Sequence, residues 1–277
     1  MTSDPSPQIV AIFGGVYNNH LALAATLASA RARGAQEIYC LGDMGGFGPS
    51  PDKVFPHLIG APDLTVMQGN YDHSIGNRLD DCACGYTDPR DNHFAQISYD
   101  YTLAHTSDAN KDWLRALPPE LRRVWGASGQ GAGQGQGQRV LMAHGSPRKV
   151  NEFMWESTCS DAFLMWLLKT QQIDALFVTH TGIPWVRRLP DGGLVVNVGA
   201  IGRPANNGRQ TVDYALVHVH DDRLDVEIVP VAYDHHRLAD EMRAEGLPEE
   251  FVETILTGYW TTCLEILPAK ERAAGVY

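Results

Sequence analysis

Short apolar runs alternate with glycine-rich and polar stretches along the first part of the chain. The runs at 8–13, 37–43 and 63–70 predict buried strands, and the stretches at 20–33 and 51–60 between them have helical spacing. Strands that alternate with helices are typical of a parallel sheet, whose ligand site lies at the carboxyl ends of its strands. The loops that follow these runs are therefore where we expect chemistry.

The same alternation continues beyond a longer helical region. Helical character is expected around 91–106 and 109–116, and again at 160–170. The runs 139–147 and 174–180 predict two more strands, each followed by a turn. The second of these strands ends at His180, and the first runs into a turn that begins near His144.

The last part of the chain has a different pattern. Short β-rich runs between 185 and 230 predict a more antiparallel sheet, and 231–257 contains two short helices. The low-complexity stretch 127–138 predicts a flexible glycine- and glutamine-rich loop. We expect one domain over 1–257, and we expect 258–277 to be a tail or a contact in a homo-oligomer.

Composition excludes several classes of protein. The chain has 277 residues, of which 44% are hydrophobic and 20% charged, as in an ordinary soluble globular protein. A net charge of −11 argues against non-specific nucleic-acid binding. No apolar run approaches the roughly 20 residues that cross a membrane, and no signal peptide is visible. Five cysteines, an odd number, do not suggest a disulfide framework, so we expect a reduced, cytoplasmic protein.

Four predicted strand ends each deliver a possible metal ligand into a loop. These residues are Asp43, Asn70, His144 and His180. A single histidine at a strand end is more often structural, but four such residues at successive strand ends are harder to explain that way. One carboxylate, one amide oxygen and two imidazoles suit a divalent transition metal such as Mn, Fe or Zn.

The motifs around these residues resemble the calcineurin-like metallophosphoesterases, in particular their bacterial and archaeal phosphodiesterase-like branch. The matching stretches are LGD followed by GGFGP, then GNYD, then HGSP, and finally HTGIP before VVNVGAIGRP. The resemblance extends from about residue 8 to 257. It implies an α/β fold, a four-layer α/β/β/α sandwich of two mixed sheets, and metal-dependent phosphoester hydrolysis.

Two motifs of that family are altered here. Its members open with D-x-H after the first strand and close with G-H-x-H. In this chain Gly15 and Tyr17 occupy the D-x-H positions, and Gly182 stands where the second histidine of G-H-x-H belongs. The resemblance therefore implies that one metal site has lost three ligands, whereas the four strand-end ligands of the other site remain. We expect one divalent metal and no tightly bound second one.

Alternatives remain open for the altered first loop. A gapped alignment would let Asn18 and His20 act as ligands. Tyr17 could ligate ferric iron as a phenolate, although an ordinary phenol pKa of about 10 makes it a poor ligand for Zn or Mg. Gly15 and Gly182 could instead leave space for a bulkier substrate, with Tyr17 lining it.

Five residues are candidates for catalysis or substrate binding. Tyr71 could donate a hydrogen bond to a leaving-group or non-bridging oxygen, with Asp72 orienting it or a neighbour; simple packing is the alternative for Tyr71. Arg203 could bind a phosphate or carboxylate, or be a solvated loop residue. Asn19 could donate to an anion at the start of a helix or cap that helix, and Tyr17 could line the substrate site.

These observations predict a phosphoesterase or phosphodiesterase-like hydrolase with a mononuclear metal site, acting on a small phosphorylated molecule. An inactive ligand-binding or scaffold protein with the same fold is the alternative, as is altered, iron-type metal chemistry. Cys82 and Cys84 form a C-x-C pair that could supply a thiol near the site or be purely structural.

Overall fold

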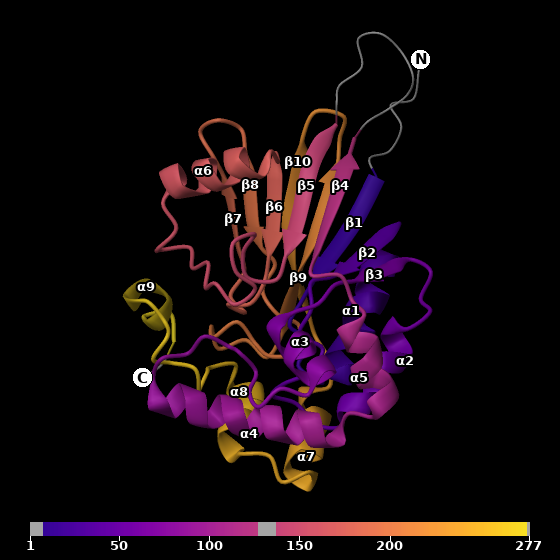
Figure 1. Cartoon of the computed structure of the whole chain (residues 1–277), viewed down its shortest axis with the longest axis vertical. Coiled ribbons are helices and arrows are strands. Elements are labelled where there is room, and N and C mark those ends of the chain that lie inside the picture. The colour runs from indigo at the N-terminus through magenta and orange to yellow at the C-terminus, as the bar shows by residue number, and fades with distance from the viewer. Residues whose placement is uncertain (1–7, 127–136, 276–277) are drawn as a thin grey trace.

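The computed structural model describes residues 8–126 and 137–275 (Figure 1). Two mixed five-stranded sheets pack face to face, and helices cover the outer face of each, which is the expected four-layer α/β/β/α arrangement. Ten residues of the predicted glycine-rich loop, 127–136, lie outside the described residues, as does the N-terminal segment 1–7.

The first sheet has the strand order β10-β9-β1-β2-β3. Strands β1, β2 and β3 are parallel, whereas β9 is antiparallel to β1 and β10 is antiparallel to β9. The strands are β1 Gln8–Phe13, β2 Glu37–Cys40, β3 Leu64–Val66, β9 Val212–Val219 and β10 Leu224–Val231.

The second sheet has the order β4-β5-β6-β8-β7, with three parallel strands in the centre and an antiparallel strand at each edge. The strands are β4 Glu120–Trp125, β5 Gln138–Ala143, β6 Ala175–Val178, β7 Trp185–Arg188 and β8 Leu194–Asn197. The β-rich runs between 185 and 230 are thus divided between both sheets, and β8 pairs in parallel with β6. The expected antiparallel character is found in the β7–β8, β9–β10 and β1–β9 pairs, but the region does not form one sheet of its own.

The helices follow the predicted order with two exceptions, α3 and α9. They are α1 His20–Ala32, α2 Phe55–Leu58 after a 3₁₀ turn Pro51–Lys53, α3 Asn70–Asn77, α4 Pro89–His105, α5 Asp108–Arg115, α6 Asp161–Gln171, α7 His235–Ala244, α8 Glu249–Thr257 and α9 Ala269–Arg272. The strand predicted over 63–70 ends at Val66, and α3 begins at Asn70. Helix α9 lies in the segment for which no helix was predicted. None of the helices in the described part of the chain combines the length and apolar character that crossing a membrane requires.

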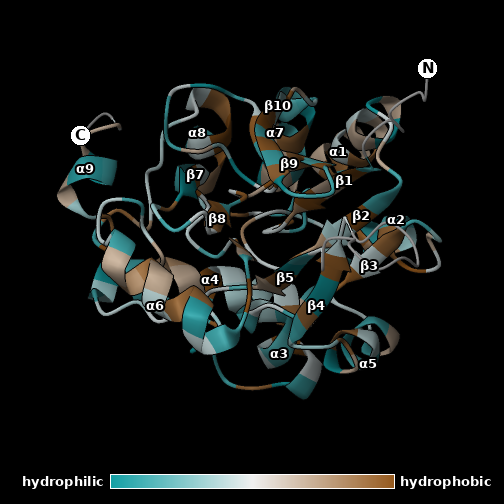
Figure 2. Cartoon of the chain, turned by 90° about the horizontal axis from the view of Figure 1, so that it is seen from above, coloured by the Kyte–Doolittle hydropathy of each residue, from teal (hydrophilic) through white to brown (hydrophobic). Residues whose placement is uncertain are grey.

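Alternation along β1 builds two separate cores. Val10 and Ile12 face the second sheet and pack in one apolar cluster with residues such as Phe177. Ala11 and Phe13 point the other way and pack in the cluster that includes α1. Figure 2, viewed from above, shows hydrophobic residues on the inner strands β1 and β9. The carboxyl ends of the parallel strands point towards the part of the molecule that α4, α7 and α8 cover (Figure 1).

The C-terminal segment that we expected to be a tail packs against the loops at this end of the sheets. Trp260 is 2% exposed, and its indole Nε1 donates a hydrogen bond of 2.7 Å to the carbonyl of Pro204. The backbone N–H of Trp260 donates to Oδ1 of Asn206 at 2.8 Å. Leu267 is buried beside it in the same apolar cluster. Residues 258–275 are thus part of the folded body.

Trp260→Ala should therefore lower the free energy of unfolding by about 3–5 kcal/mol, the usual cost of removing a large buried aromatic side chain. Chemical denaturation of the two proteins measures this difference. Trp166→Ala is the matched control, because Trp166 is 51% exposed and its loss should cost no more than about 0.5 kcal/mol. Equal stability of Trp260→Ala and wild type would show that the segment is not docked.

Candidate metal centre and adjoining pocket

The strand ends bring three of the four predicted metal ligands into one buried cluster. Asp43 follows β2, His144 follows β5 and His180 follows β6. One ligand atom from each lies within 4.8 Å of the other two, and all three residues are buried. The two sheets therefore contribute to the cluster jointly, since β2 belongs to one and β5 and β6 to the other.

The loops hold this cluster in unusual backbone conformations. Asp43 and His180 have φ values of 57° and 49°, and Tyr17 in the first loop has a φ of 49°. Such left-handed conformations are uncommon outside glycine and gather at functional sites. Gly69 has no room for a side chain, because a Cβ there would lie 2.2 Å from Asp43 Oδ1 and 2.8 Å from His144 Nδ1. The close approach of the β3 loop to both ligands depends on that glycine.

Hydrogen bonds orient the ligand atoms towards one another. Nδ1 of His144 lies 2.7 Å from the carbonyl of Leu41 and donates to it, which leaves Nε2 as the free lone pair. That Nε2 is 3.1 Å from Asp43 Oδ2 and 3.2 Å from His180 Nδ1. Ligands bound at about 2.0–2.2 Å to one metal lie about 3–3.5 Å apart. The spacing of these three atoms fits a single ion.

Asn70 supplies a buried oxygen that has no partner. Its amide Nδ2 donates 2.9 Å to the carbonyl of Cys82 and lies 3.5 Å from Cys84 Sγ. Because the nitrogen must face a carbonyl, Oδ1 is the atom left over, and it makes no hydrogen bond although it is buried. An unsatisfied buried acceptor is costly. A cation bound by Asn70 Oδ1 together with the Asp43–His144–His180 cluster would satisfy it, so the residues fit a metal.

The two imidazoles have different proton affinities. Burial alone would lower the pKa of His144, but the carboxylate of Asp43 raises it above the ordinary value. Burial and the neighbouring His144 lower the pKa of His180 to about 3. Burial and the charge of Asp43 raise the pKa of the nearby Asp72 to about 7. Protons on His144 and Asp72 therefore oppose a bound cation, whereas His180 stays neutral above pH 4.

Metal affinity should consequently fall as the pH is lowered. A metal needs the deprotonated imidazole, so binding is strongest above the pKa of His144 and weakens by at least about tenfold for each pH unit below it. Titration with Mn(II) or Zn(II) against a competing chelator between pH 5 and 8 measures this slope. Binding of equal strength at pH 5 and pH 7 would contradict the assignment of His144 as a ligand.

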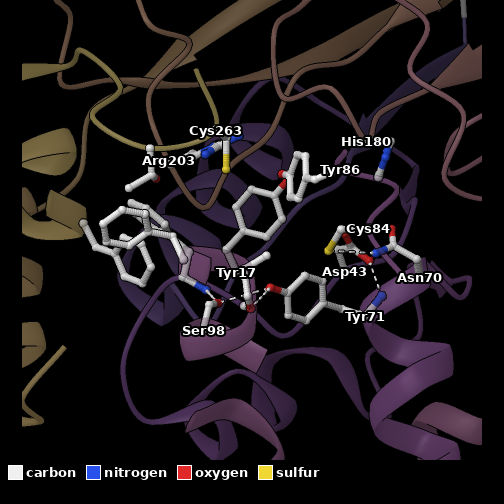
Figure 3. Close-up of a pocket in the computed structure, with 16 residues that line it drawn as sticks. Tyr17, Asp43, Asn70, Tyr71, Cys84, Tyr86, Ser98, His180, Arg203 and Cys263 are labelled. Carbon is white, nitrogen blue, oxygen red and sulfur yellow. Dashed lines mark hydrogen bonds between the residues drawn. The ribbon is translucent and has the colours of Figure 1, made fainter. Parts of the chain in front are cut away.

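The cluster opens into a pocket of about 500 Å³, counted with its mouth (Figure 3). Asp43, Asn70 and His180 form one part of its wall. The rest is largely aromatic, with side chains from the first loop, α3, α4, α8 and the loops between them: Tyr17, Phe47, Tyr71, Tyr86, Phe94 and Phe251. A largely apolar pocket with a few converging polar groups is the usual form of a small-molecule site.

Of the predicted catalytic pair, Tyr71 lines the pocket and Asp72 does not. The hydroxyl of Tyr71 donates to the Ala95 carbonyl and to Ser98 Oγ, each at 3.3 Å, so it points along α4 and away from the ligand cluster (Figure 3). Burial raises the pKa of this phenol and of Tyr17 well above the ordinary value, so both are neutral hydrogen-bond donors at neutral pH.

Asp72 contacts the backbone around Asp43 and makes no bond to the hydroxyl of Tyr71. It is fully buried, and its carboxylate accepts the backbone N–H groups of Asp43, Met44 and Gly69 at 2.6, 2.9 and 2.8 Å. These bonds join the β2 and β3 loops and thereby position Asp43. Asp72 is therefore a positioning residue, because both of its oxygens are occupied by the backbone.

Three polar residues of the first loop also have structural roles. Asn19 does not face the pocket; it caps α1 by accepting the N–H of Ala22 at 3.0 Å, and it donates to the Gly202 carbonyl at 3.1 Å. The gapped alternative for the metal was wrong as well. His20 Nε2 lies 2.8 Å from Glu241, and Asn18 donates to the carbonyl of Gly48, so neither reaches the cluster.

The space beside the cluster that two glycines were expected to free is largely filled. A Cβ at Gly15 would lie 2.8 Å from both the Tyr17 ring and Ala200, and one at Gly182 would lie 3.5 Å from the ring of Trp260. Tyr17 and Trp260 thus occupy the region next to these glycines. Of the three predicted substrate-binding residues, Tyr17 and Arg203 line the pocket.

Sequence reasoning missed the part of the pocket wall that comes from distant loops. Tyr86, Thr262 and Cys263 line the pocket, and no local pattern marks them. Cys82 and Cys84 are joined in a disulfide, which the cysteine count had not suggested. This disulfide loop also holds the side chain of Asn70 through the contacts described above.

Comparison with known proteins supports the fold. No protein-family model matches the chain. It is 24% identical over 266 residues to the uncharacterized protein MJ0912 of Methanocaldococcus jannaschii, covering 90% of this chain and 98% of that protein. Among solved structures it is similar to hypothetical protein PH1004 from Pyrococcus horikoshii OT3, with a TM-score of 0.73, 22% identity, and coverage of 91% and 99% of the two chains.

A metallophosphoesterase from Sphaerobacter thermophilus is also similar in structure. It has a TM-score of 0.66 and 24% identity, and the alignment covers 91% of this chain and 99% of that one. The chain thus has the fold of that metallophosphoesterase, which is the fold that the motifs implied. At this level of sequence identity, the similarity does not assign the activity of that protein to this chain.

Proposed function

We propose that this protein is a metal-dependent phosphoesterase that acts on a small phosphorylated molecule through one divalent transition metal. The observation that carries the proposal is the buried cluster of Asp43, His144 and His180, in which one ligand atom of each residue lies within 4.8 Å of the other two. Asn70 Oδ1, buried and without a partner, completes a set of two nitrogen and two oxygen donors. Such a set suits Mn, Fe or Zn.

The similarity to a metallophosphoesterase in fold points to phosphoester chemistry at this cluster. A bound divalent ion would supply Lewis-acid polarisation of a phosphoryl group and would acidify water at neutral pH. The residues of the chain have separate tasks. The Asp43–Asn70–His144–His180 set fixes the position of the cation, and the aromatic pocket beside it excludes water and holds the organic part of the substrate.

Tyr71 would contribute a hydrogen bond to a substrate oxygen in the pocket. Its phenol is neutral, because burial raises its pKa, and it lies in the wall of the pocket that also contains Asp43. A rotation of the hydroxyl away from Ser98 would let it donate to an oxygen of the substrate. A phenol with a raised pKa is a weak general acid, so its contribution would be electrostatic stabilisation and not full proton transfer.

Turnover of bis(p-nitrophenyl) phosphate by purified protein supplied with Mn, Fe, Ni or Zn tests this proposal. We expect hydrolysis that requires the metal, stops on chelation and returns when the metal is restored. Protein that holds one metal per chain but hydrolyses neither this diester nor p-nitrophenyl phosphate would contradict the proposal. That result would favour a ligand-binding or scaffold protein.

A further inference from the structure

Arg203 is a buried cation without an acidic partner. The residue is 6% exposed, and its Nε makes no hydrogen bond. Within residues 8–126 and 137–275 no carboxylate forms an ion pair with it, and the groups that act on it are Cys263, Tyr17 and Tyr86. A guanidinium stays charged in proteins, and a buried charge is costly unless it is paired. The described residues therefore supply no carboxylate to pair with this charge.

Aromatic rings hold the guanidinium in place. Its Cζ lies 3.7 Å from the centroid of the Trp260 ring and 5.8 Å from the rings of Tyr17 and Phe47. Stacking on an indole face stabilises a cation in part, but it offers no hydrogen-bond acceptor to the N–H groups. Trp260 is itself fixed by its bond to the Pro204 carbonyl. The side chain is thus held in place, and its Nε–H donor has no partner among the described residues.

Arg203 faces the same pocket as the metal cluster. Asp43, His180 and Arg203 all line it, and Tyr17 lies between Arg203 and Asp43 (Figure 3). Among the described residues of this lining, Arg203 is the only lysine or arginine. The whole chain carries a net charge of −11, so a lone cation inside an aromatic pocket is not part of a general basic surface.

We propose that Arg203 is an oxyanion subsite that binds a second anionic group of the substrate. This inference rests on the proposed function and narrows its substrate class. The substrate is a phosphoester that carries a further phosphate or carboxylate, with the reacting phosphate at the Asp43 end and the second oxyanion on the guanidinium. The aromatic walls between the two ends favour a flat or apolar connecting group.

Anion binding to full-length protein tests the subsite separately from the metal. Inorganic phosphate and benzoate are titrated in parallel by calorimetry into His144→Ala protein and into the same protein with Arg203→Gln added. We expect one of the two probes to bind the His144→Ala protein, and Arg203→Gln to weaken it at least tenfold. The probe that binds distinguishes a phosphate from a carboxylate subsite. Arg203→Lys, which keeps the charge, should retain part of the affinity.

Arg223→Gln is the matched control, since Arg223 is half exposed on the β9–β10 turn, and it should bind the probe as the parent does. Equal affinity with and without the Arg203 guanidinium, or no binding of either probe to the His144→Ala protein, would overturn the inference and leave the proposed function standing. Arg203-dependent anion binding by a wild-type protein that takes up no metal would have the opposite meaning: the subsite would stand and the proposed function would fail.

Discussion

Replacing His144 by alanine is expected to lower metal-dependent hydrolysis of bis(p-nitrophenyl) phosphate by at least about 100-fold. Changing a group that merely orients a metal ligand costs 10–100-fold in affinity or activity, and His144 is itself placed as a ligand. Its Nε2 lies between Asp43 Oδ2 and His180 Nδ1, at 3.1 and 3.2 Å. Without it, the set loses one of its two nitrogen donors, and the ion is held less tightly.

Steady-state kinetics at saturating metal, together with metal content after gel filtration, measure this effect. His73→Ala is the matched control, because His73 is an exposed histidine of α3, next but one to Tyr71. We expect its kinetics and metal content to equal those of wild type. Unchanged turnover in His144→Ala would mean that hydrolysis takes place elsewhere or needs no metal at this cluster.

Asp72→Ala is expected to lower the free energy of unfolding by about 3–5 kcal/mol. The substitution leaves three buried backbone N–H groups, those of Asp43, Met44 and Gly69, without an acceptor. Each unsatisfied buried donor costs about 1–3 kcal/mol, and water entering the space recovers part of the sum. Urea denaturation of metal-free protein gives the value, with Asp80→Ala at an exposed site as the control.

The variant Asp72→Asn separates a structural from a chemical role. The amide keeps one acceptor but turns an N–H₂ group towards backbone donors, so stability and metal affinity should both fall. An Asp72→Asn protein with wild-type stability and metal content but without turnover would show that the carboxylate takes part in the reaction. That outcome would make Asp72 a catalytic residue and not only a positioning one.

The strands that are plainest in the sequence are the most buried ones. Strands such as β5 and β6 are short apolar runs bounded by turns, so their own residues indicate that they are buried. Strand β4 was missed because Glu120–Trp125 is rich in charge, and its pairing at a sheet edge leaves several of these residues in solvent. Helix α3 was missed because it begins at Asn70, within the motif that also supplies a ligand.

The candidate ligands could be predicted because parallel strand ends converge whatever the details of packing. The roles of Asn19 and Asp72 could not, since short polar side chains in loops bind either a ligand or the nearby backbone, and the sequence does not distinguish these. Thr262 and Cys263 reach the pocket only through the docking of the C-terminal segment, in which Trp260 bonds to the Pro204 carbonyl. Such long-range contacts leave no local pattern.

The number of metal ions per chain tests the central claim most directly. Elemental analysis of purified protein, combined with anomalous diffraction from a Mn-soaked crystal, measures both the count and the position. We expect one ion, in contact with Asp43, Asn70, His144 and His180. A second ion of comparable occupancy beside Tyr17, or an absence of metal with all four ligands intact, would contradict this account.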